Sequence, residues 1–160
     1  MTLGHAYLTN PETGSAGEVL EAGAQAVPNR VAALLDLPAR SRAFLRRRLV
    51  VRDGEPSEIV SFWLPLDLSE GTDLTSADAL AGSIRDHLQA RKGVRVDHII
   101  EQITARMPSA DEAKQLGMPK NTPVLDVHAA VRDASGHPII VVKVLLPADR
   151  HELEDAYPTG

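Results

Sequence analysis

The feature that most constrains the fold is a set of sequence landmarks that occurs twice in the same order. Each copy has a glutamate seven residues before a proline, a Val-Arg-Asp turn sequence and a closing Leu-Pro pair. The first copy has them at Glu21, Pro28, 51–53 and 64–65, and the second at Glu101, Pro108, 131–133 and 146–147. Equivalent positions are 80 to 82 residues apart. Because a near-constant offset marks a repeated unit, we predict two copies of one supersecondary unit.

Each unit is predicted to contain a strand, a helix and two further strands, and the second unit shows this order best. Residues 94–106 carry apolar side chains at a spacing of two, which predicts a strand. Ser109 and Glu112 have the spacing of a capping box, in which hydroxyl and carboxylate each accept an N–H at the start of a helix. Gly117 predicts the end of this short helix, because glycine readily takes the left-handed conformation.

Two hairpins complete the units. In the second unit, residues 124–132 and 139–146 are strands joined by the turn sequence 133–136. In the first unit, Asp53 and Gly54 form a stronger turn signal, since Asp-Gly suits a type I′ turn. An additional helix is predicted between the units.

The additional helix is expected over residues 77–92. Leu80, Ile84 and Leu88 recur at a spacing of four residues, which is typical of one helix face, and Gly93 follows as a terminator.

Hairpins with short helices predict an α+β fold, with a mostly antiparallel six-stranded sheet covered by helices on one face. If a pseudo-two-fold axis relates the units, a ligand pocket is expected between them. Residues 1–16 are rich in Thr, Gly, Asn and Pro without an apolar period, which predicts a tail or linker. Residues 17–155 form the predicted domain, and residues 156–160 form a second tail.

Composition excludes several classes of protein. The 160 residues suffice for one domain with a sizeable core. A net charge of −5 argues against a free-standing nucleic-acid binder, which needs a basic face. Cysteine is absent, so disulfides and thiolate metal sites are excluded. No apolar run is long enough to cross a membrane and the N-terminus lacks signal-peptide features, so we expect a soluble cytoplasmic protein.

The only basic run is Arg46-Arg47-Arg48. On a strand, Arg46 and Arg48 point to one face and Arg47 to the other. One interpretation is a clamp for a phosphate or carboxylate, held by charge-assisted hydrogen bonds. The other is a solvated edge or ion pairs between subunits, and three charges taken alone favour this second interpretation.

Other chemical signals are weaker. His151 has no second histidine one turn away, so we expect no metal site. Asp126 and His128 share a strand face, where a structural or ligand hydrogen bond is more common than a catalytic dyad. Lys143 is more often a snorkelling or edge residue than a Schiff-base lysine. No nucleophile elbow or phosphate-binding glycine loop occurs, so the residues favour a binding module over an enzyme.

An ordered set of motifs resembles the UTRA domain, the effector-binding half of HutC-type regulators in the GntR family. The resemblance covers residues 17–155, nearly the whole chain. The motifs are Arg48-Leu-Val-Val-Arg-Asp-Gly-Glu-Pro56, Ser61-Phe-Trp-Leu-Pro65, Gly82-Ser83 at a helix start, residues 101–119, Thr122-Pro-Val-Leu125, Asp133-Ala-Ser-Gly-His-Pro138 and Leu146-Pro-Ala-Asp-Arg150.

The resemblance implies a chorismate-lyase-like α+β fold, a cytoplasmic homodimer and a small-molecule effector pocket without a cofactor. It also implies that DNA is bound only through an N-terminal winged helix-turn-helix domain. Residues 1–16 are too short to hold that domain, so this chain is expected to be the sensor part alone.

The resemblance further implies an anion-binding subsite. Family members that sense sugar phosphates hold the phosphate with two strand arginines and a serine at a helix start. Arg48 matches the first arginine, Val50 stands at the second position, Ser83 matches the serine, and Arg85 lies close by in the sequence.

The carboxylates that read the sugar in those members are replaced here. Their positions match Val60 and Ile140, and Phe62 and Val142 lie next to them on the same strand faces. An apolar wall would strip water from sugar hydroxyls without replacing the hydrogen bonds, at about 1–3 kcal/mol each. We therefore expect a largely apolar effector with one acidic group, and we include His128 among the ligand-binding candidates.

Two alternatives stay open. The fold resembles chorismate lyase, so the chain could be an enzyme that cleaves a small carboxylate, although an acidic partner is absent at positions 60 and 140. The chain could also be a dimerisation module that binds no ligand, which a closed apolar core between the units would favour.

Overall fold

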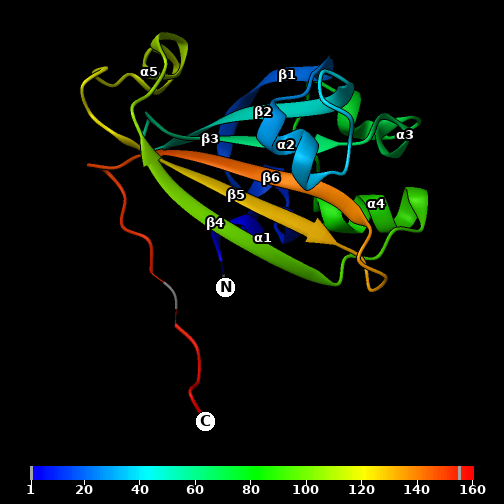
Figure 1. Ribbon diagram of the computed structural model, residues 1–160. Coiled ribbons are helices and arrows are strands. Elements are labelled where there is room, and N and C mark those ends of the chain that lie inside the picture. The colour runs from blue at the N-terminus through cyan, green and yellow to red at the C-terminus, as the bar shows by residue number, and fades with distance from the viewer. Residues whose placement is uncertain (1, 155) are drawn as a thin grey trace.

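The computed structural model describes residues 2–154 and 156–160, so Met1 and Asp155, the last residue of the predicted domain, lie outside the description. Six antiparallel strands form one sheet in the order β1-β2-β3-β6-β5-β4 (Figure 1). The strands are β1 (Ala16–Ala26), β2 (Arg42–Arg52), β3 (Glu55–Leu64), β4 (His98–Arg106), β5 (Val124–Arg132) and β6 (Pro138–Pro147). The predicted α+β fold with an antiparallel six-stranded sheet is confirmed.

Short helices join the strands and cover both faces of the sheet, so the prediction that they cover only one face is wrong. They are α1 (Leu3–Thr9), η1 (Glu12–Gly14), α2 (Asn29–Leu34), α3 (Leu66–Ser69), η2 (Asp73–Thr75), α4 (Ile84–Lys92) and α5 (Ala110–Leu116). The order strand, helix, strand, strand therefore occurs twice, as β1-α2-β2-β3 and as β4-α5-β5-β6. Within the described ranges, no helix has both the length and the apolar character needed to cross a membrane.

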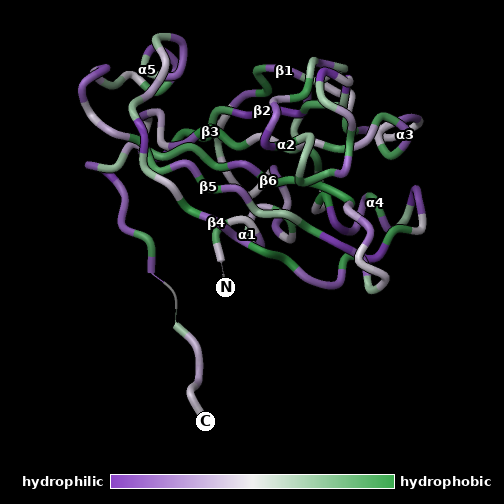
Figure 2. Tube along the Cα trace, viewed as in Figure 1, coloured by the Kyte–Doolittle hydropathy of each residue, from purple (hydrophilic) through white to green (hydrophobic). Residues whose placement is uncertain are grey.

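The two units meet at the centre of the sheet. β3 pairs with β6 through five residue pairs, from Ile59 opposite Leu145 to Trp63 opposite Val141. Both strands are almost wholly buried. The units are thus joined by backbone hydrogen bonds, and hydrophobic residues gather along the sheet between them (Figure 2).

One face of the sheet, here called the α1/α4 face, carries the main core. The apolar side chains of β3, β5 and β6 on this face form one continuous cluster with Leu8 of α1, Leu74 of η2 and Leu88 of α4. All three of these leucines are fully buried. The cluster stabilises the domain because it removes the largest apolar area from water.

The opposite face, here called the α2/α5 face, carries two smaller clusters. One lies under α2 and includes Val31, Leu45 and Trp63, and the other lies under α5 and includes Leu116 and Val124. Figure 1 shows α5 at the far left end of the sheet, well separated from α2. Polar side chains lie on the strands between the two clusters.

Local sequence signals set the element ends. Ser109 accepts a hydrogen bond from the Glu112 N–H, and the Glu112 carboxylate accepts one from the Ser109 N–H, which confirms the predicted capping box. Gly117 ends α5 with a φ of 58°. Asp53 and Gly54 have φ values of 54° and 77°, as a type I′ turn requires.

The helix predicted over residues 77–92 begins only at Ile84, so the prediction is wrong for its first half. Ser83 caps the helix by accepting a hydrogen bond from the Asp86 N–H at 3.1 Å. The preceding segment is held by Arg46, whose guanidinium donates to three backbone oxygens at 2.6–2.8 Å. These acceptors are the carbonyls of Leu74, Ser76 and Asp78. Of these acceptors, only Asp78 lies in residues 77–83, where the Leu80 N–H is also bound, by the Glu12 carboxylate. Long-range hydrogen bonds thus hold part of this segment in a non-helical path.

The prediction that residues 1–16 are a tail or linker did not anticipate the helix and the buried contacts of the described residues 2–16. Thr2 caps α1, accepting a hydrogen bond from the His5 N–H at 3.4 Å. Leu8 enters the main core, and Glu12 of η1 is buried as well. Seven helical residues are too few to show a clear period in the sequence, so packing against the sheet, rather than local pattern, defines this segment.

Candidate functional site

A buried ion pair lies at the edge of the main core, on the α1/α4 face. The Glu12 carboxylate accepts two hydrogen bonds from Arg46, at 3.0 Å from Nε and 2.7 Å from Nη2. It also accepts the backbone N–H of Leu80 at 2.9 Å. Arg46 is fully buried and Glu12 is 6% exposed. Such a bidentate, desolvated pair is strong only because nearly every donor and acceptor in it is matched.

Arg48 extends this cluster along β2. Its side chain is on the same strand face as that of Arg46, and it is 3% exposed. Its Nε lies 3.9 Å from Glu12 Oε1, and its Nη2 donates weakly to the Ser15 carbonyl at 3.4 Å. Among the described residues, its Nε has no hydrogen-bond partner. The Arg46–Arg48 centre therefore presents more positive charge than the Glu12 carboxylate neutralises.

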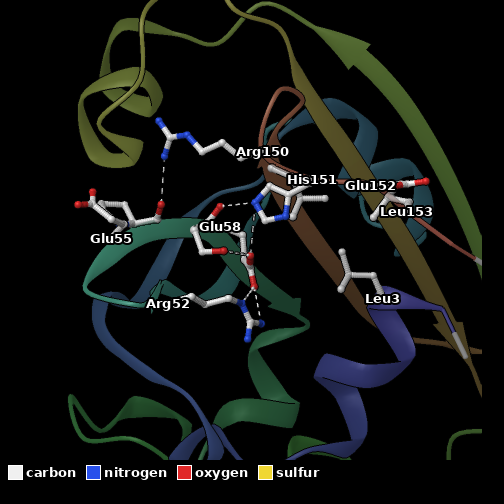
Figure 3. Close-up of a pocket in the computed structure, with 11 residues that line it drawn as sticks. Leu3, Arg52, Glu55, Glu58, Arg150, His151, Glu152 and Leu153 are labelled. Atoms are coloured by element: carbon white, nitrogen blue, oxygen red, sulfur yellow. Dashed lines mark hydrogen bonds and ion pairs between the residues drawn. The ribbon is translucent and has the colours of Figure 1, made fainter.

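A second polar cluster surrounds Glu58 on β3, beside a cavity of about 560 Å³ (Figure 3). Arg52 donates to Glu58 Oε1 at 2.8 Å, and the Tyr7 hydroxyl of α1 donates to the same oxygen. His151 lies 3.8 Å from Glu58 Oε2 and 2.9 Å from the Ser57 carbonyl oxygen. The cluster thus connects α1, the β2-β3 hairpin and the segment after β6.

The contacts of Glu58 fix its charge. Burial opposes ionisation, but hydrogen bonds from Ser57, Tyr7 and Arg52 outweigh it and lower the pKa of Glu58. Burial and the adjacent carboxylate raise the pKa of Tyr7, so Tyr7 remains a hydrogen-bond donor. The hydrogen bond from Tyr7 to Glu58 thus joins α1 to the sheet.

A third polar cluster lies on the α2/α5 face. His128 and Asp126 are both 5% exposed, with Nδ1 and Oδ1 3.5 Å apart, and Lys143 Nζ lies 3.9 Å from Asp126 Oδ2. Burial lowers the pKa of His128 to about 4 and also lowers the pKa of Lys143. Arg106 donates to Asp126 at 2.8 Å. The histidine is therefore neutral near pH 7.

The family of the chain is settled by sequence comparison. The model of the UTRA domain matches residues 14–152. The chain belongs to the UTRA domain family. A curated relative, an uncharacterized HTH-type transcriptional regulator from Streptomyces coelicolor, is 31% identical over 137 residues. The match covers 83% of this chain but only 48% of the relative, so this UTRA chain spans about half of the relative's length.

Solved structures agree with the UTRA fold. The ligand-binding domain of a GntR-family regulator from Bordetella bronchiseptica superposes with a TM-score of 0.74 at 22% identity, over 90% of this chain and 91% of that one. The effector domain of PhnF from Mycobacterium smegmatis gives a TM-score of 0.73 at 17% identity, over 92% and 90%. These neighbours share the chorismate-lyase-like fold.

The structure brings all five predicted apolar site residues of the UTRA domain onto one face. Val50, Val60, Phe62, Ile140 and Val142 all belong to the main core, on the face that carries Arg48, and each is at most 2% exposed. These five side chains are packed in the core, and a cavity that both units line lies instead beside Glu58, between the β2-β3 hairpin and the segment after β6.

The remaining predicted residues are more dispersed. Ser83 is buried, and its hydroxyl caps α4. Arg85 is partly exposed beside Asp86 and lines a different cavity, together with His5 and Val96. His128 lies on the α2/α5 face, so the sheet separates it from the other candidates.

Sequence reasoning missed Glu12 and favoured a solvated edge or ion pairs between subunits for the arginine run. The alternation of the arginine run correctly separates the buried Arg46 and Arg48 from Arg47, which is 32% exposed. A solvated edge is therefore wrong for the two buried arginines. No sequence signal marks Glu12, because it lies in a segment that we predicted to be irregular.

Metal binding has no support in the described part of the chain, where no group of three or more potential His, Cys, Asp or Glu ligands is present. His151 instead contacts the Ser57 carbonyl and Glu58.

Proposed function

We propose that this UTRA domain binds a small-molecule effector with an acidic group at the Arg46–Arg48 centre. The observation that supports this is the pair of buried guanidinium groups that face one carboxylate in the main core. Buried cations next to an apolar surface bind anions strongly, because both water and competing ions are excluded. Val60 and Phe62 lie on the same sheet face and favour an apolar body for the effector.

The domain would work as the sensor of a transcriptional regulator. DNA would be bound by a winged helix-turn-helix domain outside this chain, and the regulator would be a cytoplasmic homodimer. The effector would act by population shift, since a ligand changes DNA affinity only through different affinities for two arrangements of the protein. The family match and the regulator relative support this role.

A calorimetric screen tests the proposal. Apolar carboxylic acids and phosphosugars are titrated into the wild type, the Arg48→Met variant and the Arg47→Met variant. We expect an apolar acid to bind the wild type and the Arg47→Met control, and to lose at least about tenfold in affinity in Arg48→Met, because a charge-assisted hydrogen bond is worth about 1.5–3 kcal/mol. Tight binding of a phosphosugar, or binding unaffected by Arg48, would contradict it.

A dimerisation module that binds no ligand is the second candidate. The packed core between the units favours it. Exposed apolar side chains favour it too: Ile100 and Ile103 on β4, and Met107 directly after β4, are about half exposed. Sedimentation velocity with and without the screened acids separates the two functions. A stable dimer that binds none of the compounds would support this second candidate, and an assay of chorismate loss tests the enzymatic alternative.

A further inference from the structure

We propose that the N-terminal segment 2–15 is an internal occupant of the effector site. Its Glu12 carboxylate would hold the place of an acidic effector group on Arg46 and Arg48, and an anionic ligand would bind by displacing it. This inference rests on the proposed function and adds a competition between the effector and the protein's own chain.

The Glu12 carboxylate is bound as an acidic ligand would be. Its donors are the Arg46 side chain on β2 and the Leu80 backbone N–H before α4, at 2.7–3.0 Å. These donors come from the sheet and from the layer that covers it, whereas Glu12 comes from the segment that precedes β1. An anion site assembled by the domain is thus filled from outside the repeated units.

The site has more donor capacity than Glu12 uses. Arg48 Nε is buried, lies 3.9 Å from the carboxylate and has no hydrogen-bond partner among the described residues. A buried donor without a partner is costly, so a ligand that satisfies it gains affinity. A phosphate group, with three terminal oxygens, could contact both arginines, which the Glu12 carboxylate does not do at hydrogen-bonding distance.

The segment is held by contacts that can be broken separately. α1 has seven residues, too few to be stable without packing. Leu8 anchors it in the core, and the Tyr7 hydroxyl is bonded to Glu58. Gly4 passes so close to β5 that a Cβ at this position would overlap the Cβ of Ala129. Because the segment leads directly into β1, its release would change the path of the chain on the N-terminal side of the domain.

The test uses the full chain with inorganic phosphate and benzoate as probes, at constant ionic strength. Glu12→Gln keeps the side-chain shape but removes the charge that competes with the probe, and Glu18→Gln removes an equal charge from an exposed position. Gly4→Val displaces α1 while Glu12 is retained. We expect at least one probe to bind Glu12→Gln and Gly4→Val about tenfold or more tightly than it binds Glu18→Gln and the wild type. In the wild type, a saturating concentration of that probe should speed hydrogen exchange at residues 3–9.

The outcomes separate this inference from the proposed function. One outcome is that the wild type binds a probe at an Arg48-dependent site without any change in hydrogen exchange at residues 3–9. That result would support the proposed effector site and contradict the proposal that segment 2–15 is displaced from it. Equal affinity of folded Glu12→Gln and Glu18→Gln rejects it too. If no variant binds either probe and the acid screen is also negative, both proposals fail.

Discussion

The two faces of the sheet handle buried charge in opposite ways. On the α1/α4 face, Arg46 is fully buried and satisfied by the Glu12 carboxylate and three backbone carbonyls. On the α2/α5 face, the polar strip of Asp126, His128 and Lys143 is looser, and two of its buried atoms, Asp126 Oδ1 and His128 Nδ1, lack hydrogen-bond partners among the described residues. The comparison contrasts Arg46, whose guanidinium donors are all matched, with a polar strip between two small cores that is only partly matched. Unmatched atoms are not confined to the second face, since Arg48 Nε also lacks a partner among the described residues.

The largest effect should come from Arg46→Met. This change leaves the Glu12 carboxylate buried without its cation and leaves three carbonyls without their donor, so we expect the free energy of unfolding to fall by about 3–5 kcal/mol. Arg47→Met is the matched control, since Arg47 is partly exposed and lies 3.7 Å from Glu21, and it should cost less than about 1 kcal/mol. Urea unfolding measures both, and equal losses would contradict the contrast.

The next largest effect should be a loss of stability at acidic pH, caused by His128 on the α2/α5 face. Because burial lowers the pKa of His128 to about 4, the unfolded chain, with a histidine pKa of about 6.5, takes up the proton first as pH falls. Stability should therefore decrease between about pH 6.5 and pH 4. Urea midpoints at about pH 7.5 and pH 5 test this, and His128→Gln should show a smaller decrease. The lowered pKa values of Glu58 and Glu112 affect stability only at lower pH, below about 4.5.

Removing the N-cap serine of a helix should give a smaller difference in stability between the two faces. Ser83→Ala on α4 and Ser109→Ala on α5 each remove one capping hydrogen bond, worth about 1 kcal/mol. We expect the larger loss for Ser83, because it is 3% exposed whereas Ser109 is open to water, which can replace the hydroxyl. Thermal unfolding of the two variants measures the difference, and a larger loss for Ser109 would reverse this interpretation.

Lys143→Met should have the smallest effect. The change removes a desolvated cation, while Asp126 keeps its hydrogen bond from Arg106 at 2.8 Å. Lys143 is 22% exposed, and replacing a largely desolvated charge by an apolar side chain is often neutral or stabilising, so we expect the unfolding free energy to stay constant or rise by about 1 kcal/mol. A loss above about 2 kcal/mol would show that the polar strip on this face is as well matched as the Glu12–Arg46 pair.

Much of the fold follows from local physics that the sequence displays. The Asp53-Gly54 turn and the Ser109 capping box each involve neighbouring residues, and both are present. The repeat offset likewise agrees with the strand-helix-strand-strand order that occurs twice. The helix before Ile84 was mispredicted because apolar spacing does not show which distant residues bind that segment. The Arg46 guanidinium binds the Asp78 carbonyl, and the Glu12 carboxylate binds the Leu80 N–H.

The candidate site was less predictable for the same reason. Strand alternation placed Arg46 and Arg48 on one face, but the partner of Arg46 is Glu12, 34 positions away in a segment without a pattern. Likewise, the branched residues Val60 and Ile140 were expected to line a pocket, yet side chains of this kind are equally suited to a closed core. Alternation separates the faces of a sheet but does not reveal which face is open.

The pairing of β3 with β6 has a consequence for the newborn chain. β3 is complete at Leu64, but its partner strand begins only at Pro138, so the ribosome must make almost the entire second unit before that edge can be covered. Until then the edge of β3, whose second half 59–64 is apolar except for Ser61, is open to other chains, which is the situation in which nascent proteins aggregate. The second unit is thus the part of the chain that covers the exposed edge of the first.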